Sequence, residues 1–186
     1  MAAAPVTSPL RRALDLAYDA AGALAGLFVL VIFVMMIAQS VLRELGVPTG
    51  PVNDAVAWCC AAASFLAMAH TFRHGDFVRV TLLLEKLTPS HRRLAELACL
   101  SIAALALGYL AVAVIRFVYD SWAFKDVASG QLAVPIWIPQ SSFVLGAALL
   151  FVVVVDELVR VARGAVPTYV AEVEKRHAEG DFSSDV

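Results

Sequence analysis

Charged residues are scarce in this sequence. Only 16% of its 186 residues are Asp, Glu, Lys or Arg, whereas 61% are hydrophobic, and the mean hydropathy is +0.80. A water-soluble domain is normally about 25% charged. The net charge of -2 and the lack of a basic run give no indication of a nucleic-acid partner. Because the charges fall in short clusters between long neutral runs, the composition is typical of an integral membrane protein.

Patterns that carry catalysis or bind cofactors are also missing. The three cysteines, Cys59, Cys60 and Cys99, lie in neutral runs without CxxC spacing, so we expect neither a disulfide nor a metal site from them. His70 and His74 are four residues apart, a spacing that can place two metal ligands on one helix face, but no third ligand is obvious in the sequence. Haem ligation would require histidines on separate spans. We therefore predict a protein that is not an enzyme and has no metal or cofactor.

Four neutral runs are long enough to cross a membrane. A hydrocarbon core of about 30 Å requires about 20 helical residues, and the alternation typical of membrane strands is absent. The first run is too long for a signal peptide and lacks a good cleavage site. The sequence therefore predicts an all-α membrane domain over residues 1–163, followed by a disordered cytoplasmic tail over residues 164–186. The predicted spans are 18–42, 53–72, 94–117 and 136–158.

Basic residues predict the orientation of these spans. Lys and Arg number two before the first span, five between the second and third, and four after the fourth, against three on the opposite side. The positive-inside rule then places both termini in the cytoplasm. Trp58, Trp122 and Trp137 fall near the opposite face, where indole rings favour the membrane interface.

The segment after the second span has a mixed character. Gly75 is expected to end the second helix, and Asp76 is a candidate N-cap for a short helix over about residues 76–87. Its apolar side chains recur at helical spacing, which indicates a helix lying in the membrane interface or against a partner. A plain loop with an apolar patch is the alternative interpretation.

The predicted spans lack charged residues at mid-depth, where an ion or proton pathway would need them. They contain instead many small residues, including a GxxxG step from Gly22 to Gly26, which allow helices to approach closely in lipid. This pattern argues against a stand-alone transporter or pump. It favours a membrane subunit without an active site of its own.

A set of positions that begins at Trp58, continues through Arg73, Gly75 and Arg79 and ends at Pro135 and Trp137 resembles the small membrane subunit (DctQ type) of tripartite ATP-independent periplasmic (TRAP) transporters. The resemblance extends over roughly residues 15 to 160 and includes "FLAMA" at 65–69. Three positions depart from the family pattern: Asn53 replaces an acid, Phe77 a histidine and Thr81 an aspartate. The matching motif and interface candidates are Trp58, Arg73, Gly75, Val78, Arg79, Val80, Pro135 and Trp137.

The resemblance implies a function shared with partners in the bacterial inner membrane. A large membrane subunit (DctM type) would carry the substrate and ion sites, and a periplasmic binding protein would deliver an organic anion such as a carboxylate. A sodium gradient would drive import, with this chain acting as a scaffold in the lipid bilayer. Two alternatives are a membrane anchor of a redox complex, which requires axial histidines on different helices, and an autonomous small channel or exporter.

Overall fold

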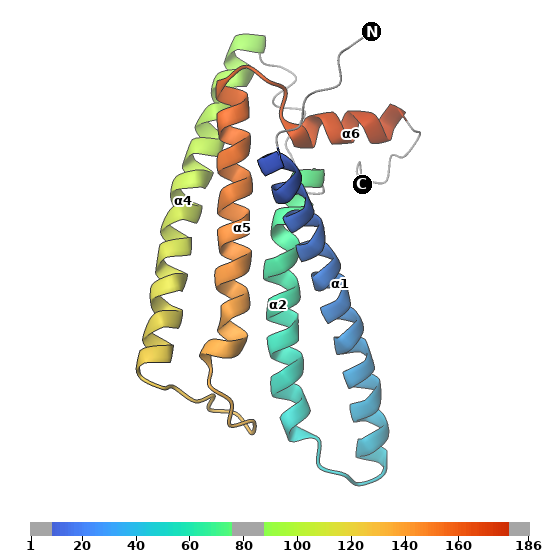
Figure 1. The fold of residues 1–186 in the computed structure, drawn as a ribbon. Helices are drawn as coiled ribbons and strands as arrows, with labels where there is room; N and C mark the ends of the chain where they lie inside the picture. The colour runs from blue at the N-terminus through green and yellow to red at the C-terminus, as the bar shows by residue number, and fades with distance from the viewer. Residues whose placement is uncertain (1–8, 76–87, 179–186) are drawn as a thin grey trace.

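The computed structural model describes residues 9–75 and 88–178, and in this part of the chain the secondary structure is helical, with one isolated bridge between Val127 and Pro135. Four helices are long and apolar enough to cross a membrane, which confirms the predicted all-α fold with four spans. They are α1 (Pro9–Glu44), α2 (Gly50–His74), α4 (Pro89–Ala123) and α5 (Trp137–Ala162), and a shorter helix, α6 (Thr168–Ala178), follows them (Figure 1).

Local sequence explains where the helices begin and end. Pro51 lies in the first turn of α2 and Pro89 opens α4, positions where the missing proline N–H costs no helical hydrogen bond. Gly75 ends α2 with a φ of 76°, a left-handed conformation that glycine adopts without steric cost. The prediction that Gly75 ends the second helix is therefore confirmed.

The four long helices form a row in the order α1, α2, α5, α4 (Figure 1). Each packs against its neighbour in the row, so that α1 and α4 lie at the two outer edges. Consecutive helices run in opposite directions, which brings the start of α1, the end of α2, the start of α4 and the end of α5 to one end. The helix α6 crosses that same end at a steep angle to the row.

Glycine at contact points sets how closely the helices approach. A Cβ on Gly146 of α5 would lie 2.5 Å from the backbone oxygen of Phe65 in α2, so only glycine fits there. A Cβ on Gly108 of α4 would lie 3.1 Å from the Phe151 ring. The two glycines of the GxxxG step differ, because Gly22 faces His70 whereas a Cβ on Gly26 would have no neighbour within 4 Å.

The outer faces of the row are apolar and exposed. Leu30, Phe33 and Ile37 on α1 are more than half exposed, as are Leu105 and Tyr109 on α4. Side chains of this kind are stable beside lipid tails, so exposure here is what a spanning helix requires. At 36 and 35 residues, α1 and α4 are each over 50 Å long at about 1.5 Å per residue, more than a bilayer core needs.

The tail differs from its prediction. Residues 168–178, expected to be disordered, form the helix α6, in which Tyr169 is 4% exposed. The prediction weighed the acidic excess of the whole tail and missed the helical spacing of Tyr169 and Val173, both of which lie against Gly75. The predicted interfacial helix over residues 76–87, with Phe77, Val78, Arg79, Val80 and Thr81, lies outside the described residues.

Candidate functional site

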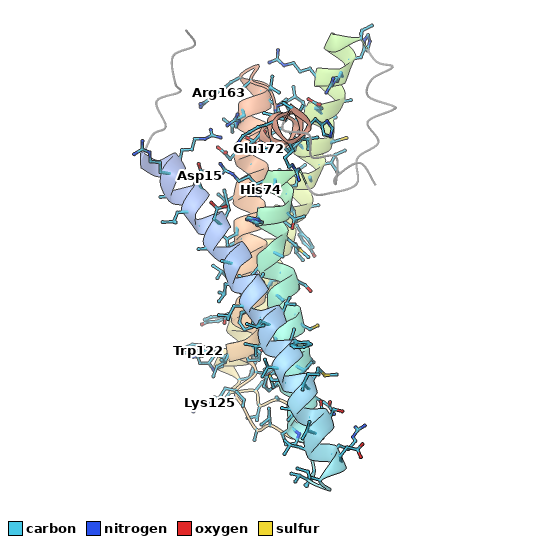
Figure 2. All side chains as sticks on the ribbon, turned by 90° about the vertical axis from the view of Figure 1, so that its right-hand side faces the viewer. Asp15, His74, Trp122, Lys125, Arg163 and Glu172 are labelled. Carbon is cyan, nitrogen blue, oxygen red and sulfur yellow. The ribbon has the colours of Figure 1, made fainter. Side chains whose placement is uncertain are left out.

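Polar side chains gather at the two ends of the helical row (Figure 2). Asp15, His74, Arg163 and Glu172 lie at the end that α6 crosses, whereas Trp122 and Lys125 lie at the opposite end. We call these the α6 end and the loop end. The distinction matters because any site for a charged ligand or a polar partner must use one of these two ends.

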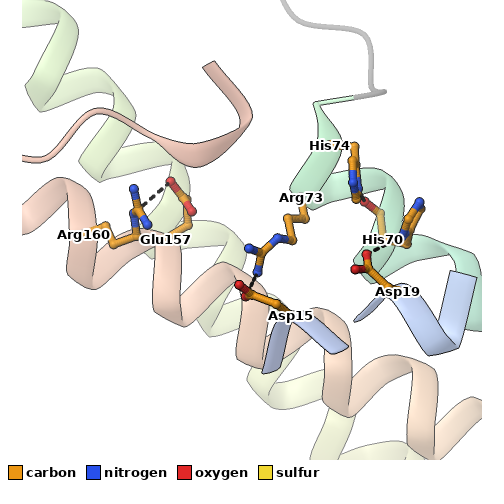
Figure 3. A network of polar contacts seen from close by, with 7 residues as sticks. All are labelled: Asp15, Asp19, His70, Arg73, His74, Glu157 and Arg160. Carbon is orange, nitrogen blue, oxygen red and sulfur yellow. Dashed lines mark hydrogen bonds and ion pairs between the residues drawn. The ribbon is translucent and has the colours of Figure 1, made fainter. Parts of the chain in front are cut away.

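At the α6 end, Arg73 joins α2 to α1. Its guanidinium forms an ion pair with the Asp15 carboxylate, and its Cζ lies 5.5 Å from the centre of the Tyr18 ring (Figure 3). Tyr18 is fully buried. A planar guanidinium that lies over an aromatic ring and pairs with a carboxylate is a contact that lysine would not reproduce. The motif residue Arg73 therefore has a structural role between two spans.

Two histidines of α2 lie beside Arg73, and the first of them, His70, contacts α1. The Nδ1 atom of His70 lies 3.5 Å from an Asp19 carboxylate oxygen (Figure 3). The Nδ1 atom of His74 is 2.9 Å from the His70 carbonyl oxygen, and the two rings are in contact, tilted by 33° with centres 4.1 Å apart. The sequence did not reveal Asp19 as a neighbour, because it lies on a different helix.

The helix α6 is attached to the ends of α5 and α2. The carboxylate of Glu157, 3% exposed, accepts a hydrogen bond from the Thr168 N–H at the start of α6. The Tyr169 ring packs edge-on against Phe72 at 5.7 Å between centres. In the last turn of α6, Arg176 donates a hydrogen bond to the His74 carbonyl oxygen over 2.6 Å.

Gly75 has a second requirement beyond its φ angle. A Cβ there would lie 2.8 Å from the Tyr169 carbonyl oxygen, so a side chain would push α6 away from α2. The family motif position Gly75 is thus explained by two structural demands, a left-handed turn and a close helix contact.

At the loop end, Asp54 of α2 holds the connection between α4 and α5. One of its carboxylate oxygens accepts hydrogen bonds from the backbone N–H groups of Gln131 and Leu132, over 2.7 and 3.3 Å. A Cβ on Gly130 would lie 2.2 Å from that oxygen, so the loop approaches closely only because residue 130 is glycine. Asn53, the neutral replacement in the acidic pair, accepts a hydrogen bond from Gln39 of α1 over 2.8 Å.

The motif residues Pro135 and Trp137 also lie at the loop end. Pro135 belongs to a short antiparallel turn in which Ile136 donates to Asp126 and Ala128 to Val134. A shallow hollow of about 460 Å³ is lined by Trp122, Ala123, Lys125, Val127, Pro135 and Trp137. Trp58 is half-buried on α2, separate from this hollow.

Between the two ends, the described helices offer little chemistry. The hydroxyl groups of Ser64 and Ser142 donate to carbonyl oxygens of their own helices, those of Cys60 and Pro139. A hollow of about 350 Å³ beside Ser64, lined also by Met68 and Leu150, is almost entirely apolar. Such a surface suits lipid or another helix, since it has few groups to bind an organic anion.

A comparison with known families shows which kind of membrane protein this is. Residues 32–164 match the family described as "Tripartite ATP-independent periplasmic transporters, DctQ component". The chain belongs to this family. It is therefore a small membrane subunit of a TRAP transporter, a multi-pass membrane protein and not an enzyme. No curated protein and no solved structure shows a match to it.

The DctQ match runs from within α1 to just beyond the end of α5, so it includes the loop end and the parts of the α6 end that α2, α4 and α5 form, but neither the start of α1 nor α6. Sequence reasoning identified Arg73, Gly75, Pro135 and Trp137. It missed Asp15, the partner of Arg73, and Tyr169, the neighbour of Gly75. It also missed three residues that pair with other side chains or backbone groups at the two ends, because all five lie far from their partners in the chain and have no local pattern of their own: Asp19 with His70, Gln39 with Asn53, and Glu157 with Thr168.

Proposed function

We propose that this DctQ subunit is a scaffold that holds a large DctM-type subunit in the bacterial inner membrane. The complete transporter would import an organic anion such as a carboxylate, delivered by a periplasmic binding protein and driven by a sodium gradient. The observation that carries the scaffold role is the distribution of polar groups. In residues 9–75 and 88–178 the charged side chains gather toward the helix ends, while the middle of each span is apolar.

The division of labour follows from the cost of polar groups in lipid. A substrate anion or a sodium ion at membrane depth requires charged or hydrogen-bonding partners to replace its water shell. Ser64 and Ser142 use their hydroxyl groups within their own helices. The substrate and ion sites therefore belong to the partner subunit, and this chain contributes position and orientation.

The α6 end is proposed to face the cytoplasm, which places both termini there. Support comes from the basic side chains of the described residues, which concentrate at that end, against Arg43, Arg116 and Lys125 toward the other. The loop end would then face the periplasm, where Trp122 and Trp137 suit the interface. Basic residues at the α6 end are Arg11, Arg12, Arg73, Arg92, Arg93, Arg160, Arg163, Lys175 and Arg176.

The orientation has a direct test in a cysteine-free variant. Single cysteines introduced as Thr49→Cys and Ala128→Cys should react in intact cells with a thiol reagent that does not cross the membrane. Ser90→Cys should react only after the membrane is permeabilised. Labelling of position 90 in intact cells would reverse the proposed orientation.

The scaffold role is tested by reconstitution. The purified DctQ subunit alone should show no calorimetric heat of binding with a panel of organic acids. Proteoliposomes that contain both membrane subunits, supplied with the binding protein and an inward sodium gradient, should accumulate the substrate, and those without this subunit should not. Transport by this subunit alone would contradict the proposal.

A further inference from the structure

The strongest cluster that the scaffold role does not use is formed by Asp19, His70 and His74 at the α6 end. Each offers one ligand atom, and these atoms lie within 4.8 Å of one another. The three side chains come from two helices: Figure 3 shows Asp19 of α1 opposite His70 of α2, with His74 beside His70 on α2. Two imidazoles and one carboxylate are the ligand types of zinc and related transition-metal sites.

Two features indicate that this position is built for a ligand. Glycine at position 22 lets α1 pass beneath the imidazole, because a Cβ there would lie 2.7 Å from the His70 Cγ. The His70 Nδ1 atom is buried and has no hydrogen-bond partner among the described residues, since the Asp19 oxygen at 3.5 Å is too distant for one. A buried ring nitrogen without a partner carries a desolvation cost of about 1–3 kcal/mol.

The second histidine, His74, is already held in a tautomer that can coordinate a metal ion. Its Nδ1 atom lies 2.9 Å from the His70 carbonyl oxygen, and as a donor in that bond it leaves the lone pair on Nε2. Histidines that bind metals usually donate their other ring N–H in this way, to a carbonyl or a carboxylate. The backbone of α2 therefore sets the tautomer that a metal ion requires.

We propose that Asp19, His70 and His74 bind one divalent transition-metal ion, with Zn²⁺ as the representative, and that the ion holds α1 against α2. Metal–ligand distances of about 2.0–2.1 Å place tetrahedral ligand atoms about 3.4 Å apart, so the cluster must contract when the ion binds. Asp19 makes this possible, because its side chain is 61% exposed and turns without displacing a packed neighbour. Water completes the coordination. The imidazole nitrogens select against Mg²⁺ and Ca²⁺, which take oxygen ligands.

The test uses the full chain, purified in detergent without a histidine tag and stripped with a chelator. Titration with Zn²⁺ by calorimetry should give one saturable equivalent. Bound Co²⁺ should give visible bands of nitrogen and oxygen ligands. A thiolate charge-transfer band would place the ion at Cys59, Cys60 or Cys99 instead and would overturn the proposal.

Variants assign the ligands. His70→Asn and Asp19→Asn should each weaken Zn²⁺ binding by at least about tenfold. The matched control is His91→Asn, because His91 bonds Thr88 at the start of α4, outside the cluster. This control should bind as the parent does. Unchanged affinity in His70→Asn, or no saturable binding by the parent chain, would refute the site.

A further variant separates lost binding from lost folding. Asp19→His replaces the carboxylate ligand by an imidazole on the exposed side of α1 and should retain one equivalent of Zn²⁺. Zn²⁺ should raise the thermal unfolding temperature of the parent and of Asp19→His, but leave that of His70→Asn unchanged. An equal rise in His70→Asn would show that the ion stabilises the protein from another place.

Discussion

Single residues determine how closely the helices pack and how the loops are attached. Gly146 and Gly75 are needed because neighbouring backbone oxygens of Phe65 and Tyr169 occupy the space of a Cβ. The sequence predicted Gly75 as a helix end from local rules, and that prediction is confirmed. It could not predict the role of Gly146, because the demand comes from a helix far away in the chain.

The contact at Gly146 predicts a position-specific effect of alanine. In Gly146→Ala the new Cβ would overlap the Phe65 carbonyl oxygen at 2.5 Å, and backbone atoms cannot rotate away. We expect a loss of about 1–3 kcal/mol in unfolding free energy, the range for overpacking. Gly26→Ala is the matched control, since its Cβ has no neighbour within 4 Å. Unfolding in detergent measures both, and equal stability of the two variants would contradict the α2–α5 packing.

Asp54 predicts a local effect at the loop end. Asp54→Ala removes the acceptor for the Gln131 and Leu132 N–H groups. A hydrogen bond to a charged acceptor typically contributes about 1.5–3 kcal/mol to stability. Amide hydrogen exchange of residues 130–132 should become faster. Asp126→Ala, in the same connection, should have a smaller effect there, because Asp126 bonds Ile136 through its backbone carbonyl. Equal exchange in both variants would show that Asp54 does not hold the loop.

At the scale of elements, hydrophobic runs predicted the four spans well because lipid imposes both length and composition on a spanning helix. The helix α6 was not predicted, because it is stabilised by contacts with residues far away in the chain, those of Tyr169 with Phe72 and of Arg176 with the His74 carbonyl. The motif residues Val78, Arg79 and Val80 lie outside the described residues, so the interfacial helix stays a prediction.

The attachment of α6 depends on Glu157. In Glu157→Ala the Thr168 N–H loses the carboxylate that accepts from it, and Arg160 loses its ion pair at 3.9 Å. Hydrogen exchange over residues 168–172 should become faster, while exchange in the middle of α5 stays unchanged. Asp156→Ala removes the neighbouring charge but not this hydrogen bond and serves as the control. Unchanged exchange in Glu157→Ala would mean that the contacts between α6 and α2 hold α6 in place without Glu157.

At the scale of the whole molecule, an open row of helices with two polar ends suits a subunit that supports another. The row leaves α1 and α4 at its edges with exposed apolar side chains, which lipid or a partner helix covers. The DctQ match gives the transporter family. We propose that the residues that select the substrate belong to the partner subunit and not to this chain.

The central claim is that this subunit does not line the transport pathway, and substrate selectivity tests it most directly. In proteoliposomes with the complete transporter, Ser64→Ala and Ser142→Ala should leave unchanged the ratio of sodium-driven uptake between two competing organic anions. Their hydroxyl groups bond their own helices and face no substrate in this account. A substitution at either serine that changes which anion is preferred would show that this subunit forms part of the substrate site.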